Sequence, residues 1–110
     1  MKSVVLMAAS LALLGGASAG AAEVSPEMLA EGKAVFTETA VPNCGICHTL
    51  ADAGTAGMIG PVLDDLKPDT ARVEKAVTSG VGVMPAYAET LSADEIEAVA
   101  RYVATSSGGE

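Results

Sequence analysis

The chain has 110 residues, with 14 acidic and 6 basic side chains and a formal net charge of −8 at pH 7. This acidity, without any basic stripe interleaved with aromatic residues, argues against a nucleic-acid-binding protein. A single domain of this size buries only about 60–65% of its unfolded surface, and three aromatic side chains make a thin core that needs a further source of stability.

The first residues have the pattern of a cleaved export signal. Residues 4–14 are almost wholly apolar after a short basic start, and residues 17–19 (Ala-Ser-Ala) form a small-x-small signal peptidase site. We expect residues 1–19 to be removed, with cleavage at Ala22 as the alternative, and residues 20–110 to form one domain. The apolar run is too short to span roughly 30 Å of hydrocarbon, so we expect no stable membrane insertion after signal removal.

A helix is predicted to begin after this segment. Ser25, Pro26 and Glu27 combine a capping hydroxyl, a proline at the first helical position and an acid in the first turn. We expect the helix to extend to about Glu38, with Phe36 among the residues that face inward.

Residues 44–48, Cys-Gly-Ile-Cys-His, are the most informative part of the chain. Cys44 and Cys47 have the spacing at which each thiol can form a thioether to a porphyrin vinyl group, and the adjacent His48 is typical of a proximal iron ligand. The motif therefore predicts one covalently bound haem c. His48 is the only histidine, which excludes bis-histidine ligation. Two thiols and one imidazole are also too few for a structural zinc site, which takes four ligands.

Residues 51–67, rich in glycine and proline, are predicted to form a loop. Asp69 is a candidate cap for a second helix over about residues 70–78, which Gly80 would end. A flexible, apolar segment follows at residues 80–87.

Three methionines beyond the signal segment could supply the second axial ligand of the iron. Met58 lies ten residues after His48, so we expect it on the histidine side of the haem, and Met28 belongs to the first helix. Met84 lies beyond the second helix in a loop that could cross the opposite face, and Pro85 stiffens its backbone. We therefore predict His48 and Met84 as the axial ligands. A thioether favours ferrous iron, raises the reduction potential and suits electron transfer.

The last helix has the clearest pattern. Residues 92–95 (Ser-Ala-Asp-Glu) form a capping box, and apolar residues follow at helical spacing from Ile96 to Val103. We expect residues 106–109 to be a frayed tail. Without a convincing alternating strand, the chain is predicted to be all-α.

The order of these parts resembles that of a class I monohaem cytochrome c over essentially all of the chain beyond the signal segment. The parts that carry the resemblance are Gly32 and Phe36 in the first helix, the Cys-Gly-Ile-Cys-His motif, Gly60-Pro61, Met84-Pro85 and an aromatic residue at the end of the last helix. The resemblance implies an all-α fold of three to four helices, with loops wrapped around one haem.

The resemblance also implies particular contacts. The carbonyl of Pro61 would accept a hydrogen bond from Nδ1–H of His48 and so fix the ring. The first and last helices would cross closely at a glycine and an aromatic pair, and the residues at the matching places are Gly32, Phe36, Val99 and Tyr102. Apart from the resemblance, Arg72, Lys67, Lys75 and the Tyr87 hydroxyl could pair with haem propionates, although for each basic residue we expect a solvated helix face instead.

We expect a periplasmic electron carrier and not an enzyme, with redox proteins as its partners. The acidic surface favours a partner with a basic docking face. Residues 84–103 are similar to small bacterial and photosynthetic cytochromes. Residues 59–69 resemble small periplasmic cytochromes that serve dehydrogenases, sulfite dehydrogenase among them. The alternative is a tightly bound haem subunit of a periplasmic dehydrogenase complex. A thiol–disulfide protein would need a strand–helix–strand unit around the cysteines, which the pattern does not show.

Overall fold

The structure is a computed structural model that describes Ser10 and residues 24–110, so the predicted cleavage site lies outside the described residues. The helices and strands are α1 (Pro26–Ala34), the π-helical turn η1 (Val35–Thr39), α2 (Cys44–Cys47), β1 (Thr49–Leu50), the 3₁₀ turn η2 (Ala51–Ala53), β2 (Thr55–Ala56), α3 (Leu63–Leu66), α4 (Thr70–Ser79) and α5 (Ala93–Ser107). Within this described part, no helix is long and apolar enough to cross a membrane.

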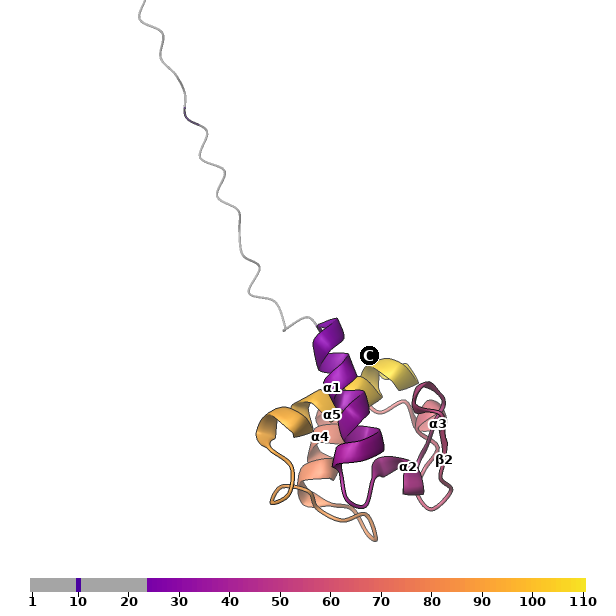
Figure 1. The fold of residues 1–110 in the computed structure, drawn as a ribbon. Helices are drawn as coiled ribbons and strands as arrows, with labels where there is room; N and C mark the ends of the chain where they lie inside the picture. Colours follow the sequence, from indigo (N-terminus) through magenta and orange to yellow (C-terminus); the bar gives the residue numbers. More distant parts are fainter. Residues whose placement is uncertain (1–9, 11–23) are drawn as a thin grey trace, which may run out of the picture.

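The crossing of α1 and α5 organises the fold (Figure 1). Gly32 permits the close approach, since a Cβ there would lie 2.5 Å from Cβ of Tyr102 and would overlap the backbone carbonyl of Ala98. One turn further, the ring of Phe36 packs edge-on against Tyr102, with 6.0 Å between ring centroids. The predicted contact of the two helices is therefore confirmed.

The beginning of the first helix is also confirmed. The Ser25 hydroxyl accepts a hydrogen bond from the amide of Met28 at 3.1 Å. The helix ends close to the predicted residue, but its last turn is π-helical. There the amide of Ala40 donates to the carbonyl of Val35, five residues earlier, at 3.0 Å.

The prediction of a loop without strands over residues 51–67 was incomplete. β1 and β2 form a short antiparallel pair joined through Gly54, which has φ 67°. The Thr55 hydroxyl closes this hairpin, because it donates to the carbonyl of His48 at 2.9 Å and accepts from the amide of Leu50 at 3.2 Å. Strands of two residues are too short to produce a detectable alternation.

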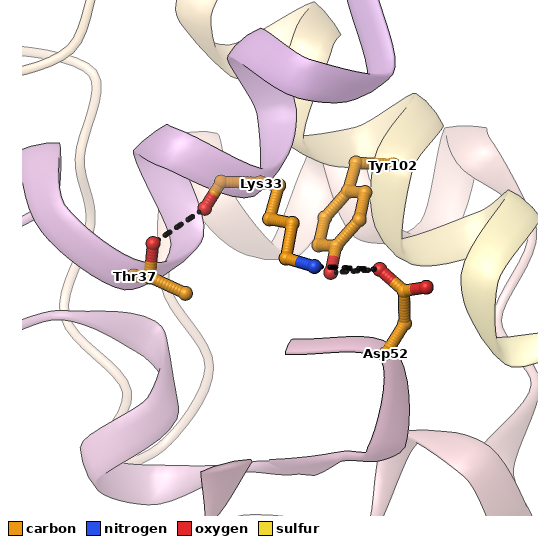
Figure 2. Close-up of polar contacts among 4 residues, drawn as sticks. All are labelled: Lys33, Thr37, Asp52 and Tyr102. Atoms are coloured by element: carbon orange, nitrogen blue, oxygen red, sulfur yellow. Dashed lines mark hydrogen bonds and ion pairs between the residues drawn. The ribbon is translucent and has the colours of Figure 1, made fainter. Parts of the chain in front are cut away.

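The hairpin is joined to the helix crossing by a polar contact (Figure 2). The Tyr102 hydroxyl donates to Asp52 at 2.6 Å, and Nζ of Lys33 lies 3.6 Å from the same carboxylate. Burial and this hydrogen bond raise the pKa of Tyr102. The ion pair is about half exposed on both sides and stabilises the fold little, so the tyrosine makes the main connection.

The starts of α4 and α5 follow the predicted caps. Asp69 accepts from the amide of Arg72 at 2.8 Å, and Ser92 and Glu95 form the reciprocal capping box. The predicted frayed tail is wrong, since α5 extends to Ser107 and the residues after it bond back to the helix.

Candidate haem-binding site

An apolar cavity of about 520 Å³ lies between α4, α5, the turn of α2 and the loop before α5. Its walls are mainly aliphatic and aromatic side chains, including Phe36, Leu63, Val73, Val77, Val99 and Val103. Most of these residues are otherwise buried in the core. The cavity therefore lies inside the hydrophobic core, in space that further side chains would fill in a larger domain.

The two thiols lie at one edge of this cavity. Cys44 and Cys47 are both free and both line it, on a single helical turn capped by Asn43, whose side chain accepts from the amide of Ile46 at 3.2 Å. Burial raises the pKa of the Cys44 thiol to about 11. A reactive thiolate needs a lowered pKa, and the shift at Cys44 is in the opposite direction.

The imidazole of His48 enters the same cavity and has a fixed orientation. Its Nδ1 lies 2.8 Å from the carbonyl oxygen of Pro61. A carbonyl can only accept, so Nδ1 is the donor, and in the neutral ring Nε2 then has a free lone pair. This is the tautomer in which Nε2 can bind a metal.

Gly60 lies against the face of the His48 imidazole ring. A Cβ at Gly60 would come within 2.5 Å of Cε1 of His48, and the Gly60 amide donates to the carbonyl of Cys47 at 2.7 Å. From the sequence, Gly60 was expected to have no role beyond its place beside Pro61. Gly60 could have been identified from the predicted bond between His48 and the Pro61 carbonyl. A ring held by that carbonyl leaves room only for a small residue at the position before Pro61.

The loop after α4 brings Met84 to the cavity. Val81 and Met84 exchange backbone hydrogen bonds of 3.1 and 2.9 Å, and the positive φ angles of Gly80 and Gly82 allow this tight turn. The amide of Tyr87 donates to the carbonyl of Val77 at 2.8 Å and so fixes the loop to α4.

Among the methionines that the structure describes, Met84 alone lines the cavity. The side chain of Met58 is 88% exposed and lies outside the cavity. Met28 lies on α1 and does not line the cavity either. The structure thus brings together Cys44, Cys47, His48, Pro61 and Met84, the residues singled out from the sequence. The assignment of Met84 as an iron ligand stays a prediction.

Comparisons with known proteins agree with this arrangement. A family model described as cytochrome C oxidase, cbb3-type, subunit III, matches residues 27–103. The chain is 37% identical to cytochrome c6 from Cladophora glomerata over 93 residues, which cover 73% of this chain and 90% of that protein. The chain belongs to the cytochrome c family.

Two further comparisons support the same family for this c-type cytochrome. Cytochrome c6 from Diacronema lutheri is 32% identical over 85 residues, which cover 73% of this chain and 98% of the relative. The crystal structure of the c-type cytochrome SorU from Sinorhizobium meliloti superposes with a TM-score of 0.74 at 54% identity, covering 76% of this chain and 95% of that chain. The predicted class I cytochrome c fold is confirmed.

The family carries covalently bound haem c and transfers electrons, and this c-type cytochrome is an electron-transfer protein rather than a catalytic enzyme. Its side chains fit that cofactor. The cavity is apolar, offers two thiols on one turn, and contains an imidazole whose Nε2 is free to bind iron.

Two of the suggested propionate partners can be placed. The hydroxyl of Tyr87 donates to the carbonyl of Pro42 at 2.6 Å, so this hydroxyl already has an acceptor within the protein. Arg72 lines the cavity, although its side chain is largely exposed.

Replacing Gly60 with alanine is expected to destabilise the haem-loaded cytochrome by about 1–3 kcal/mol, because the new methyl group must displace the His48 ring or the loop. Thermal unfolding followed in the Soret band measures this effect. Gly54→Ala is the control in the same loop, since no heavy atom lies within 4 Å of its added methyl group. Because Gly54→Ala is itself expected to cost about 1 kcal/mol through backbone strain at φ 67°, Gly60→Ala should unfold at a lower temperature than this control. Equal unfolding temperatures for the two variants would show that the contact with His48 is unimportant.

Proposed function

We propose that this cytochrome carries single electrons between a periplasmic donor and a respiratory acceptor, with haem attached to Cys44 and Cys47 and the iron bound by His48 and Met84. The observation that supports this proposal is that the two thiols, the imidazole with its free Nε2 and the thioether side chain all line one cavity. Bound haem c would supply one-electron oxidation and reduction, and with His48 and Met84 as its iron ligands no position would remain for a substrate.

The surface around the cavity supports a role in brief docking. Ile59, Val81 and Val83 line the cavity that would hold the haem and so lie around it, and the neighbouring Met58, which does not line the cavity, is 88% exposed. Residues 54–63 and 80–88 contain no charged side chain. We call Met58, Ile59, Val81 and Val83 the apolar rim. Exposed apolar groups of this kind mark interaction sites.

The rest of the molecule is strongly acidic, with a formal net charge of −8 for the full chain. We propose that the partner presents apolar groups to the rim and basic groups around them. The negative field would speed association with such a partner and make the rate fall as ionic strength rises.

Export and the identity of the donor belong to the same proposal. Residues 1–19 would direct the chain to the periplasm, leaving residues 20–110 as the mature cytochrome, and N-terminal sequencing of the exported protein tests this. A sulfite dehydrogenase is a candidate donor because residues 59–69 resemble cytochromes that serve dehydrogenases. The second candidate function is a permanent haem subunit of such an enzyme, which co-purification through high salt would indicate.

Stopped-flow electron transfer with a basic partner tests the docking proposal. Val83→Asp is expected to lower the second-order rate constant about fivefold or more, since the new carboxylate would be desolvated at the contact. Ala30→Asp adds the same charge at an exposed position of α1 that does not line the cavity, and it serves as the control. Equal rate constants for the two variants, at equal reduction potentials, would exclude docking at the apolar rim.

A further inference from the structure

The residues that follow α5 fold back onto the segment between α3 and α4. Gly108 takes the left-handed conformation with φ 87°, and the amide of Gly109 donates to the carbonyl of Ala104 at 2.8 Å. A Cβ at Gly109 would overlap the carbonyl of Pro68. The backbone of this tail therefore lies directly against the residue two positions before α4.

Glu110 extends this contact with its side chain. Its carboxylate accepts two hydrogen bonds from Thr70, one from the backbone amide at 3.2 Å and one from the hydroxyl at 2.5 Å. Thr70 is the first residue of α4, and the N-cap Asp69 separately accepts from the amide of Arg72. Two carboxylates thus satisfy different amides in the first turn of α4, where negative charge also interacts favourably with the helix dipole.

The segment that receives these bonds is part of the cavity wall. Leu66 and Pro68, which precede α4, line the cavity, and so does Val73, one turn into the helix. Thr70 is itself only 9% exposed. Thr70 lies between Pro68 and Val73 in the chain, so a hydrogen bond that holds Thr70 restrains the residues of the cavity wall on both sides of it.

We propose that Glu110 is a positioning residue for the haem cavity, whose carboxylate holds Thr70 and thereby sets the position of Pro68 and Val73 against α5. Glu110 does not line the cavity and acts only through Thr70. The role is independent of which donor and acceptor the cytochrome serves.

The charges around Glu110 give this contact a pH dependence. The two bonds from Thr70 lower the pKa of Glu110, Arg101 on α5 lowers it further, and Asp69 opposes the shift. The Lys67 side chain lies close to Gly108 on the same side. Because the pKa is lower in the folded than in the unfolded state, the contact is complete at neutral pH. It is lost as the pH falls through the folded-state pKa.

Nuclear magnetic resonance of the haem-loaded protein tests the proposal with Glu110→Ala, Glu110→Gln and the control Glu74→Gln. Glu74 is exposed on the same helix, α4. In Glu110→Ala the Thr70 amide is expected to exchange about fivefold faster, as for the loss of a cap, and the Val73 methyl resonances should shift. The control should change neither. In the wild type the Thr70 amide resonance should titrate with Glu110, and in Glu110→Gln that titration should disappear.

Unchanged exchange of the Thr70 amide and unchanged Val73 methyl resonances in Glu110→Ala would overturn this proposal. The proposed electron-transfer function would still stand, because it does not depend on Glu110. Val73 shifts in Glu74→Gln as large as those in Glu110→Ala would also overturn it, because the effect would then be one of charge alone. If Glu110→Ala does not fold, Glu110→Gln gives the answer through the lost Thr70 titration. Persistence of that titration in Glu110→Gln contradicts the proposal.

Discussion

Replacing Met84 with alanine is expected to lower the reduction potential by a few tenths of a volt, within the range of about 0.8 V that axial ligands cover. The thioether favours ferrous iron, and Met84 alone of the described methionines lines the cavity. The variant should also lose the weak far-red ferric band that is typical of methionine–iron ligation. Spectroelectrochemical titration measures both changes on one sample.

Met58→Ala is the matched control for this experiment. The Met58 side chain is 88% exposed and does not line the cavity, so its loss should leave the ferric spectrum unchanged and the potential nearly so. A wild-type potential and spectrum in Met84→Ala would remove Met84 as the ligand. A large change in Met58→Ala would show that the loop is arranged differently around the haem.

Replacing Gly32 with alanine should destabilise the cytochrome by about 3 kcal/mol, at the upper end of the cost of overpacking a core. The added methyl group would overlap the backbone of Ala98 and approach Cβ of Tyr102 to 2.5 Å. Backbone cannot rotate away as a flexible side chain can, so α1 must move off α5. For a domain of this size the melting temperature should fall by roughly 10 °C or more.

Circular dichroism of haem-loaded protein checks this expectation, with Gly54→Ala as the control. The control has open space at the new methyl group and should cost about 1 kcal/mol, because alanine is strained at φ 67°. A Gly32→Ala protein with the same melting temperature as the control would contradict the close crossing of α1 and α5.

The features that could be predicted from the sequence are those set by neighbouring residues. The caps at Ser25, Asp69 and Ser92 lie within four residues of the amides that they accept from, so each helix start is determined locally. The motif of residues 44–48 is equally local, since a single turn carries both Cys44 and Cys47, which line the cavity.

The features that the sequence could not show depend on contacts between distant segments. Tyr102 meets Asp52 from 50 residues away, and Tyr87 reaches Pro42 across 45 residues. Residues 106–109 were expected to fray, yet the residue that follows them, Glu110, bonds to a residue 40 positions earlier. No local pattern contains these pairings, because tertiary packing alone brings the partners together.

The most direct test of this account is the visible spectrum of the exported protein, oxidised and reduced, with the intact mass of the same sample. We predict one haem of added mass, sharp reduced α and β bands and the far-red ferric band typical of iron bound by histidine and methionine. Haem mass with a high-spin spectrum would contradict ligation by Met84. No haem mass from a host that matures c-type cytochromes would contradict the attachment of haem to Cys44 and Cys47.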